Sequence, residues 1–182
     1  EEAACREAYL MDPAAMESAW AATLEQLDSL IGLESVKKEV RSLINLIKVR
    51  AMRKEHDLKV MDMSFHMVFT GNPGTGKTTV ARLVAKIYKK LGFLSKGQLI
   101  ETDRSGLVAG FVGQTAGKVT DVVNSALGGI LFIDEAYALN GKGDNDFGQE
   151  AIDTLLKAME DHRDDLVVIV AGYDGLMEKF IQ

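Results

Sequence analysis

The sequence has few of the residues that build disulfides, break helices or span membranes. Its single cysteine, Cys5, can form no internal disulfide and cannot build a metal site alone, which suits a reducing compartment and predicts a cytoplasmic protein. Only two prolines occur, Pro13 and Pro73, so helices can run long. No apolar run approaches the roughly 18 residues that a membrane span needs, and no signal peptide opens the chain. We therefore expect no membrane partner.

Positive charge is also in the minority. Lys and Arg number 21 against 27 Asp and Glu, which gives a formal net charge of −6. This balance argues against a globally basic nucleic-acid binder, although a local basic patch stays open. Hydrophobic residues make up 47% and charged residues 26%, the balance of an ordinary globular protein. The length of 182 residues predicts one domain with an appended arm.

Helical patterns precede the first expected strand. Pro13 is well placed at the first position of a helix over about 14–27. Apolar residues at intervals of three and four predict a second, longer helix over about 34–55. We assign residues 1–27 to an N-terminal helical arm and residues 28–182 to an α/β core.

From residue 65 onward, short apolar runs alternate with helical patterns. The expected strands lie at 65–70, 98–101, 129–133 and 166–170, the expected helices at 77–91, 115–127 and 148–161, and a glycine-punctuated loop at 104–113. Strands that alternate with helices indicate a parallel sheet inside a three-layer α/β sandwich. We predict the strand order 2-3-4-1, with the first strand at an edge of the sheet.

One segment matches the phosphate-binding pattern G-x-x-x-x-G-K-S/T in full, from Gly71 to Thr78. It follows an expected strand and opens an expected helix, as the pattern requires. Glycines let backbone N–H groups turn around phosphate oxygens, while Lys77 supplies positive charge and Thr78 offers a hydroxyl to Mg²⁺. The expected nucleotide-binding residues here are Asn72, Pro73, Gly74, Thr75, Gly76, Lys77, Thr78 and Thr79. The alternative is a glycine-rich turn that carries a lysine by coincidence.

Two acids, Asp134 and Glu135, directly follow the apolar run 129–133. Because ligands of open α/β sheets bind at the carboxyl ends of the strands, both carboxylates are expected beside the phosphate loop. Asp134 would hold Mg²⁺, mainly through its waters, and Glu135 would orient or deprotonate an attacking water. The alternative is a solvated pair at a helix start, where acids are favoured. With the phosphate loop upstream, the pair predicts ATP hydrolysis, with Glu135 and Lys77 as catalytic residues.

Taken together, these motifs resemble the AAA+ ATPases, a family of P-loop NTPases. More narrowly, the chain resembles the branch that contains the stage V sporulation protein K and the X-type red rubisco activase. The similar stretches are residues 30–37, 66–82, 107–115, 126–139 and 146–172, so the resemblance covers about residues 28–182. It implies an ATP-driven remodeller that forms a hexameric ring, hydrolyses ATP with Mg²⁺ and acts on a protein client.

The resemblance also implies roles outside the two motifs. Ile31 and Gly32 fall where the family places backbone against adenine. Phe111 and Val112 fall at a pore loop that grips a polypeptide; because loops are exposed as a rule, a core phenylalanine there would be unusual, and packing under the sheet edge is the alternative. Asp174 lies near the position that senses the γ-phosphate, although a carboxylate beside a triphosphate is repelled unless Mg²⁺ is close.

The family's fifth strand, arginine finger and helical lid would lie beyond residue 182. We therefore expect the chain by itself to be a nucleotide-binding core with little turnover. Two other functions stay open. One is a nucleotide-gated scaffold that threads no client; the other is a DNA-linked P-loop ATPase, whose salt-sensitive DNA binding the net charge of −6 argues against. A small-molecule kinase is a weaker fourth, because Glu135 directly after Asp134 favours water activation.

Overall fold

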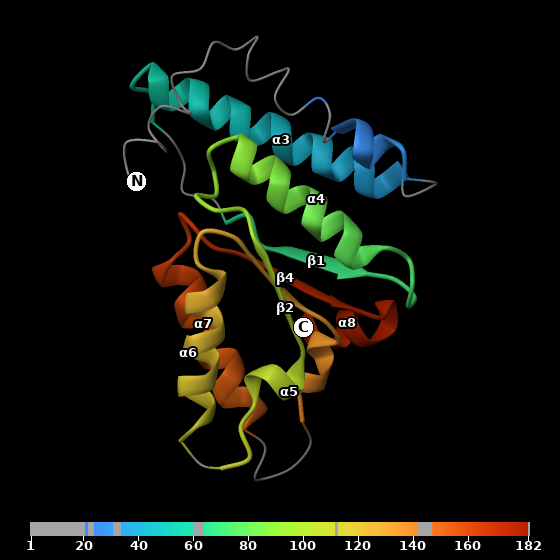
Figure 1. Cartoon of the computed structure of the whole chain (residues 1–182), viewed down its shortest axis with the longest axis vertical. Helices are drawn as coiled ribbons and strands as arrows, with labels where there is room; N and C mark the ends of the chain where they lie inside the picture. The colour runs from blue at the N-terminus through green and yellow to red at the C-terminus, as the bar shows by residue number, and fades with distance from the viewer. Residues whose placement is uncertain are drawn as a thin grey trace.

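The structure, a computed structural model, describes residue 21 and residues 24–30, 34–59, 64–111, 113–141 and 147–181. Its centre is a sheet of four parallel strands (Figure 1). The strands are β1 (Met67–Thr70), β2 (Leu99–Thr102), β3 (Ile130–Ile133) and β4 (Val167–Gly172). They pair in the order β1-β4-β3-β2, which confirms the predicted order 2-3-4-1 with the first strand at an edge.

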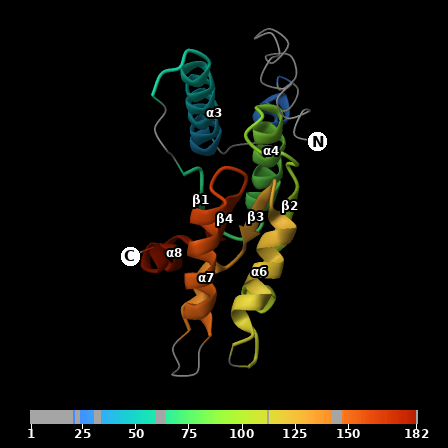
Figure 2. The same ribbon diagram turned by 90° about the vertical axis from the view of Figure 1, so that its left-hand side faces the viewer.

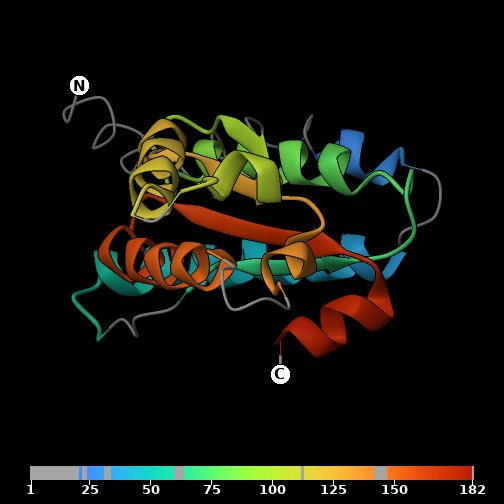
Figure 3. The same ribbon diagram turned by 90° about the horizontal axis from the view of Figure 1, so that it is seen from below.

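Helices cover both faces of this sheet, as the alternating pattern predicted. They are α3 (Glu34–Glu55), α4 (Lys77–Lys90), α5 (Arg104–Leu107), α6 (Thr115–Ala126), α7 (Gly148–Asp161) and α8 (Asp174–Ile181), with a short 3-10 helix η1 (Ala136–Leu139). Figures 1 and 2 show α3 and α4 above the strands and α6 and α7 below them. Figure 3, seen from below, shows α8 beside these layers. The arrangement is a three-layer α/β sandwich.

Strand β3 explains how one sheet serves two cores. Ile130 and Phe132 pack into the apolar cluster on the α3–α4 side, whereas Leu131 and Ile133 pack into the cluster on the α6–α7 side. All four side chains are fully buried. A strand covered on both faces is apolar at every position rather than at every second one. The continuous run that predicted a buried strand has this cause.

Two short helices lie where the sequence analysis expected none. Helix α5 falls inside the predicted loop 104–113, and Asp103 caps it: its carboxylate accepts hydrogen bonds from Ser105 Oγ (2.6 Å) and the Gly106 N–H (3.0 Å). These bonds lower the pKa of Asp103. Helix η1 follows Glu135 directly. Glycines within 104–113 suggested a loop, but a capping aspartate can start a helical turn there.

Some predicted features lie outside the described residues. These are most of the arm helix 14–27, together with Ile31, Gly32 and Val112. Within the described part of the arm, Leu27 is fully buried in the same apolar cluster as α3 and α4. Among the described residues, no helix is both long enough and apolar enough to cross a membrane.

Candidate functional site

The segment that matches the phosphate-binding pattern joins β1 to α4 at the carboxyl edge of the sheet. Gly74 and Gly76 have φ angles of 72° and 85°, a left-handed conformation that glycine adopts without strain. The Gly76 carbonyl accepts the Val80 N–H at 2.9 Å, so α4 begins directly after the loop. The free N–H groups of a first helical turn form a site for anions. The local backbone therefore has the form that the sequence pattern predicted.

Hydrogen bonds close this loop around the ammonium group of Lys77. Lys77 Nζ donates to the carbonyl oxygens of Gly71 (2.9 Å) and Asn72 (3.0 Å). Thr75 Oγ1 donates to the same Asn72 carbonyl at 2.8 Å. The Gly71 N–H donates to Gly172 O at 3.1 Å, which ties the start of the loop to the end of β4. The positive charge is thus held at the loop, where a phosphate would need it.

Asp134 and Glu135 follow β3 at the same edge of the sheet. The Asp134 N–H donates at 2.9 Å to the carbonyl oxygen of Thr102, the last residue of β2. Asp134 Oδ1 accepts the Glu135 N–H at 3.0 Å. Glu135 adopts φ 48° and ψ 43°, which is uncommon for a residue with a side chain. Such strain is tolerated where surrounding contacts impose it, and it concentrates at functional sites.

The sheet pleat directs Asp134 toward α4. Phe132 packs into the cluster on the α4 side, and side chains two residues apart along a strand share a face. Asp134 follows the last residue of β3, and if the same alternation continues it shares the face that α4 covers, where Thr78 is the second helical residue. Glu101 of β2, which is paired with Phe132, reaches the same place, with Oε1 3.4 Å from Thr78 Oγ1.

This donor set fits a magnesium ion that is shared with a nucleotide. Thr78 and Asp134 offer hydroxyl and carboxylate oxygens, the hard ligands that Mg²⁺ prefers. No group of three or more His, Cys, Asp or Glu side chains able to hold a metal occurs in the part of the chain that the structure describes. Mg²⁺ commonly binds through one or two protein ligands together with phosphates and waters rather than in an all-protein cage.

Two tyrosines, Tyr137 of η1 and Tyr173 after β4, lie near Glu135 at this edge of the sheet. Desolvation raises the pKa of Tyr137, and the negative charge of Glu135 raises it further. The Tyr137 ring lies 6.1 Å from that of Tyr173, centroid to centroid, and Tyr173 follows β4. Helix α8 then begins at Asp174, which is exposed. Asp174 thus lies at the carboxyl end of β4, on the same edge as the phosphate loop.

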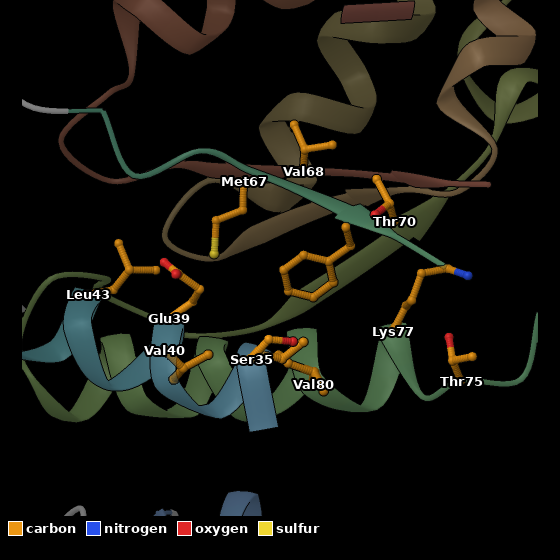
Figure 4. Close-up of a pocket in the computed structure, with 12 residues that line it drawn as sticks. Ser35, Glu39, Val40, Leu43, Met67, Val68, Thr70, Thr75, Lys77 and Val80 are labelled. Carbon is orange, nitrogen blue, oxygen red and sulfur yellow. The ribbon is translucent and has the colours of Figure 1, made fainter. Parts of the chain in front are cut away.

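A cavity of about 370 Å³ adjoins the phosphate loop between α3, β1 and α4. In Figure 4, Thr75 and Lys77 lie at one end of it and Leu43 at the other. Its walls are more apolar than polar, with Val40 from α3, Phe69 from β1 and Val80 from α4. The cavity reaches α3 just after the segment that was expected to contact adenine.

A second cavity, of about 420 Å³, connects Glu135 with residues 103–110. Arg104 Nη1 donates to Ala138 O at 2.7 Å, so the start of that segment is bonded to the helix that follows Glu135. At the far end of the segment, Phe111 is 72% exposed. This exposure excludes the alternative in which Phe111 packs beneath the sheet edge.

Comparison with known proteins agrees with this geometry. Residues 67–181 match the family described as the ATPase family associated with various cellular activities, or AAA. The chain belongs to the AAA family. Membership in this family implies that the chain binds ATP.

Two curated relatives are similar to this AAA chain over most of its length. Stage V sporulation protein K of Bacillus subtilis (strain 168) is 48% identical over 157 residues, which cover 86% of this chain and 49% of that protein. The chloroplastic ribulose bisphosphate carboxylase/oxygenase activase of Cyanidioschyzon merolae (strain NIES-3377 / 10D) is 48% identical over 159 residues, 86% of this chain and 54% of that protein. The AAA chain thus spans about half the length of both.

The solved structures support the fold. The crystal structure of the FIGL-1 AAA domain in complex with ADP superimposes with a TM-score of 0.55, at 24% identity, over 78% of this chain and 46% of that one. The four-stranded parallel sheet is therefore that of an AAA domain.

Sequence reasoning missed three residues that lie beside the predicted site residues or beside η1. They are Glu101 beside Thr78, Arg104 beside η1, and Tyr137 beside Glu135. A signal existed only for Glu101, which stands near the carboxyl end of an expected strand, where the ligands of parallel sheets gather. The other two depend on η1, which was not predicted.

Proposed function

We propose that this chain is the ATP-binding and ATP-hydrolysing module of a Mg²⁺-dependent AAA ATPase that remodels a protein client in a hexameric ring. One observation carries the proposal: a lysine ammonium held at a phosphate loop lies at the same edge of one parallel sheet as Asp134 and the strained Glu135. Neither the phosphate loop nor the acid pair would by itself support ATP hydrolysis. A loop binds phosphate, and the acid pair adds the means to cleave it.

In this proposal, each polar group at the edge has one task. The backbone N–H groups of residues 74–79 and the Lys77 ammonium bind the β- and γ-phosphates and stabilise the negative charge of the transition state. Thr78 and Asp134 would hold Mg²⁺, which neutralises charge on the same phosphates. Glu135 orients an attacking water and accepts its proton. Asp174, at the end of β4, contacts the γ-phosphate side of the site.

The adenine would bind where α3 begins. The expected contacts are backbone groups of Ile31 and Gly32. The mainly apolar cavity beside Thr75 supports this position, because it joins the phosphate loop to the first turns of α3. Ligand pockets of this size are usually apolar with a few polar groups at one end. Leu27, in the described part of the arm, packs into the same apolar cluster as α3.

The client would be gripped by Phe111 and Val112. Support comes from the exposure of Phe111 and from the Arg104–Ala138 hydrogen bond, which links the preceding segment to the helix after Glu135. A change at Glu135 during hydrolysis can thus be transmitted to the client loop. We also propose a cytoplasmic location, in keeping with the lone Cys5.

The substitution Lys77→Ala tests the nucleotide site. It removes the loop's ammonium charge, so ATP binding to the intact protein is expected to disappear in isothermal titration calorimetry with Mg²⁺ present. Lys157→Ala, on the exposed surface of α7, is the matched control and should bind like the wild type. Normal ATP affinity in the Lys77 variant would refute the assignment.

A further inference from the structure

Glu101 connects two residues of α4 that lie one helical turn apart. Its Oε1 is 3.4 Å from Thr78 Oγ1, and its Oε2 is 3.6 Å from Arg82 Nη2. Thr78 and Arg82 are four residues apart, so they project from the same face of the helix. One carboxylate of β2 therefore contacts the expected cation ligand with one oxygen and a guanidinium with the other.

The contact with Thr78 has a direct chemical consequence. A threonine hydroxyl carries one proton and two lone pairs. When the hydroxyl donates its proton to a carboxylate, both lone pairs are free to face a cation. The hydroxyl oxygen then becomes a better electron-pair donor to that cation. Groups behind metal ligands commonly fix ligand orientation in this way, and their loss costs about 10–100-fold in metal affinity or activity.

The contact with Arg82 keeps the carboxylate in position. A guanidinium attracts one carboxylate oxygen, which leaves the other for Thr78. Stability does not explain the arrangement, because the Arg82 side chain is 62% and that of Glu101 46% exposed, and exposed ion pairs contribute little to folding.

We propose that Glu101 is a positioning residue of the magnesium site, which acts by holding the hydroxyl proton of Thr78 so that the hydroxyl oxygen faces the cation. Glu101 itself is not a ligand of the ion. The inference rests on the proposed function, since it requires a nucleotide-bound cation at Thr78.

The test is the Mg²⁺ dependence of ATP binding by the intact protein. Affinity for a fluorescent ATP analogue is measured in EDTA and over a Mg²⁺ titration, for the wild type and Glu101→Ala. The variant is expected to need about tenfold more Mg²⁺ for half-maximal tightening. Its affinity in EDTA should be unchanged or higher, because a negative charge near the phosphates has been removed. A merely structural defect would weaken binding in both conditions.

Two further variants sharpen the test. The control is Glu160→Ala, which removes a glutamate that also pairs with an arginine, Arg163, at 3.3 Å. Glu160 lies at the C-terminal end of α7, outside the proposed site, so the Mg²⁺ requirement should stay unchanged. In a Thr78→Ala background, replacing Glu101 should have no further effect, because Glu101 acts through that hydroxyl. Additive effects of the two substitutions would overturn the inference.

The outcomes separate the two proposals. An unchanged Mg²⁺ requirement in Glu101→Ala, or equal losses with and without Mg²⁺, overturns the role of Glu101 while the ATPase proposal stands. Absence of ATP binding by the wild type overturns both. If circular dichroism shows that Glu101→Ala does not fold, Glu101→Leu serves instead: it keeps a side chain of similar size but offers no acceptor to the Thr78 hydroxyl, so a raised Mg²⁺ requirement is expected, and an unchanged one refutes the inference.

Discussion

At the scale of single residues, the candidate site depends on where backbone conformation directs a few side chains. Glu135 illustrates this, because its left-handed conformation turns the chain out of β3 immediately after Asp134. Asp134 fixes that turn by accepting the Glu135 N–H. The turn gives the two adjacent acids different surroundings, which suits the proposed roles of Asp134 at the cation and Glu135 at the water.

Replacing Glu135 by Gln separates these tasks. The amide keeps the size of the side chain but cannot accept a proton, so ATP hydrolysis by the intact protein should fall by about 10²–10⁴-fold while ATP binding is kept. Phosphate release and calorimetry measure the two quantities. Glu55→Gln, at the exposed end of α3, should leave both unchanged. Turnover at the wild-type rate in the Glu135 variant would remove Glu135 as the base.

At the scale of elements, the helices around the site dock with little room to spare. A Cβ added at Gly148, the first residue of α7, would lie 1.9 Å from the backbone oxygen of Leu139 in η1. Gly148→Ala should therefore lower the free energy of unfolding by about 1–3 kcal/mol. Gly117→Ala in α6 meets nothing within 4 Å and should raise it by about 0.5–1 kcal/mol. Urea denaturation measures both, and changes of the same sign would contradict the docking argument.

The junction between β1 and β4 contains a titratable group. His66 Nδ1 accepts the Val168 N–H at 3.0 Å, a bond that only the unprotonated nitrogen can make. Burial lowers the pKa of His66, although a hydrogen bond with the backbone of Met159 opposes the shift. Because the folded state disfavours the proton, this contribution to stability is present above the unfolded pKa of about 6.5 and is lost as pH falls below it toward the lowered folded value.

Unfolding at pH 7.5 and pH 5.5 tests this assignment. The loss of unfolding free energy between the two pH values should be smaller in His66→Gln than in the wild type, by up to about 1.4 kcal/mol, because only one pH unit separates the unfolded pKa of about 6.5 from pH 5.5. His162→Gln, at an exposed position just after α7, should keep the wild-type pH dependence. An identical pH dependence in wild type and His66→Gln would show that His66 does not contribute.

At the scale of the whole molecule, the proposed nucleotide site and the proposed client loop are linked by one segment of chain, residues 103–110. If the intact protein is a threading ATPase, an unfolded polypeptide such as casein should stimulate its ATP hydrolysis. Phe111→Ala should remove that stimulation and keep basal hydrolysis, because the ring is 72% exposed and supports no core. Leu156→Ala, an exposed apolar side chain on α7, is the matched control. Stimulation that survives in Phe111→Ala would favour the scaffold function instead.

Most of the correct predictions of helices and strands came from local patterns of apolar residues. The helix over 34–55 was predicted with its observed bounds, and each of the four strands was found within one to two residues of its expected start. Periodicity reports such elements because each buries one stripe or face. Helices α5 and η1 were missed because a single turn of helix has no period to detect, and glycines nearby suggested a loop.

Each strand, each long helix, the phosphate loop and the acid pair could be predicted from a short stretch of chain, because the spacing and chemistry of neighbouring residues encode them. Which distant groups meet depends instead on how the elements pack in three dimensions. Thr78 and Glu101 are 23 positions apart, Arg104 and Ala138 are 34 apart, and His66 and Val168 are 102 apart. These contacts follow from parallel strand order and helix docking, which bring one end of every strand to a common edge, and no local pattern records that meeting.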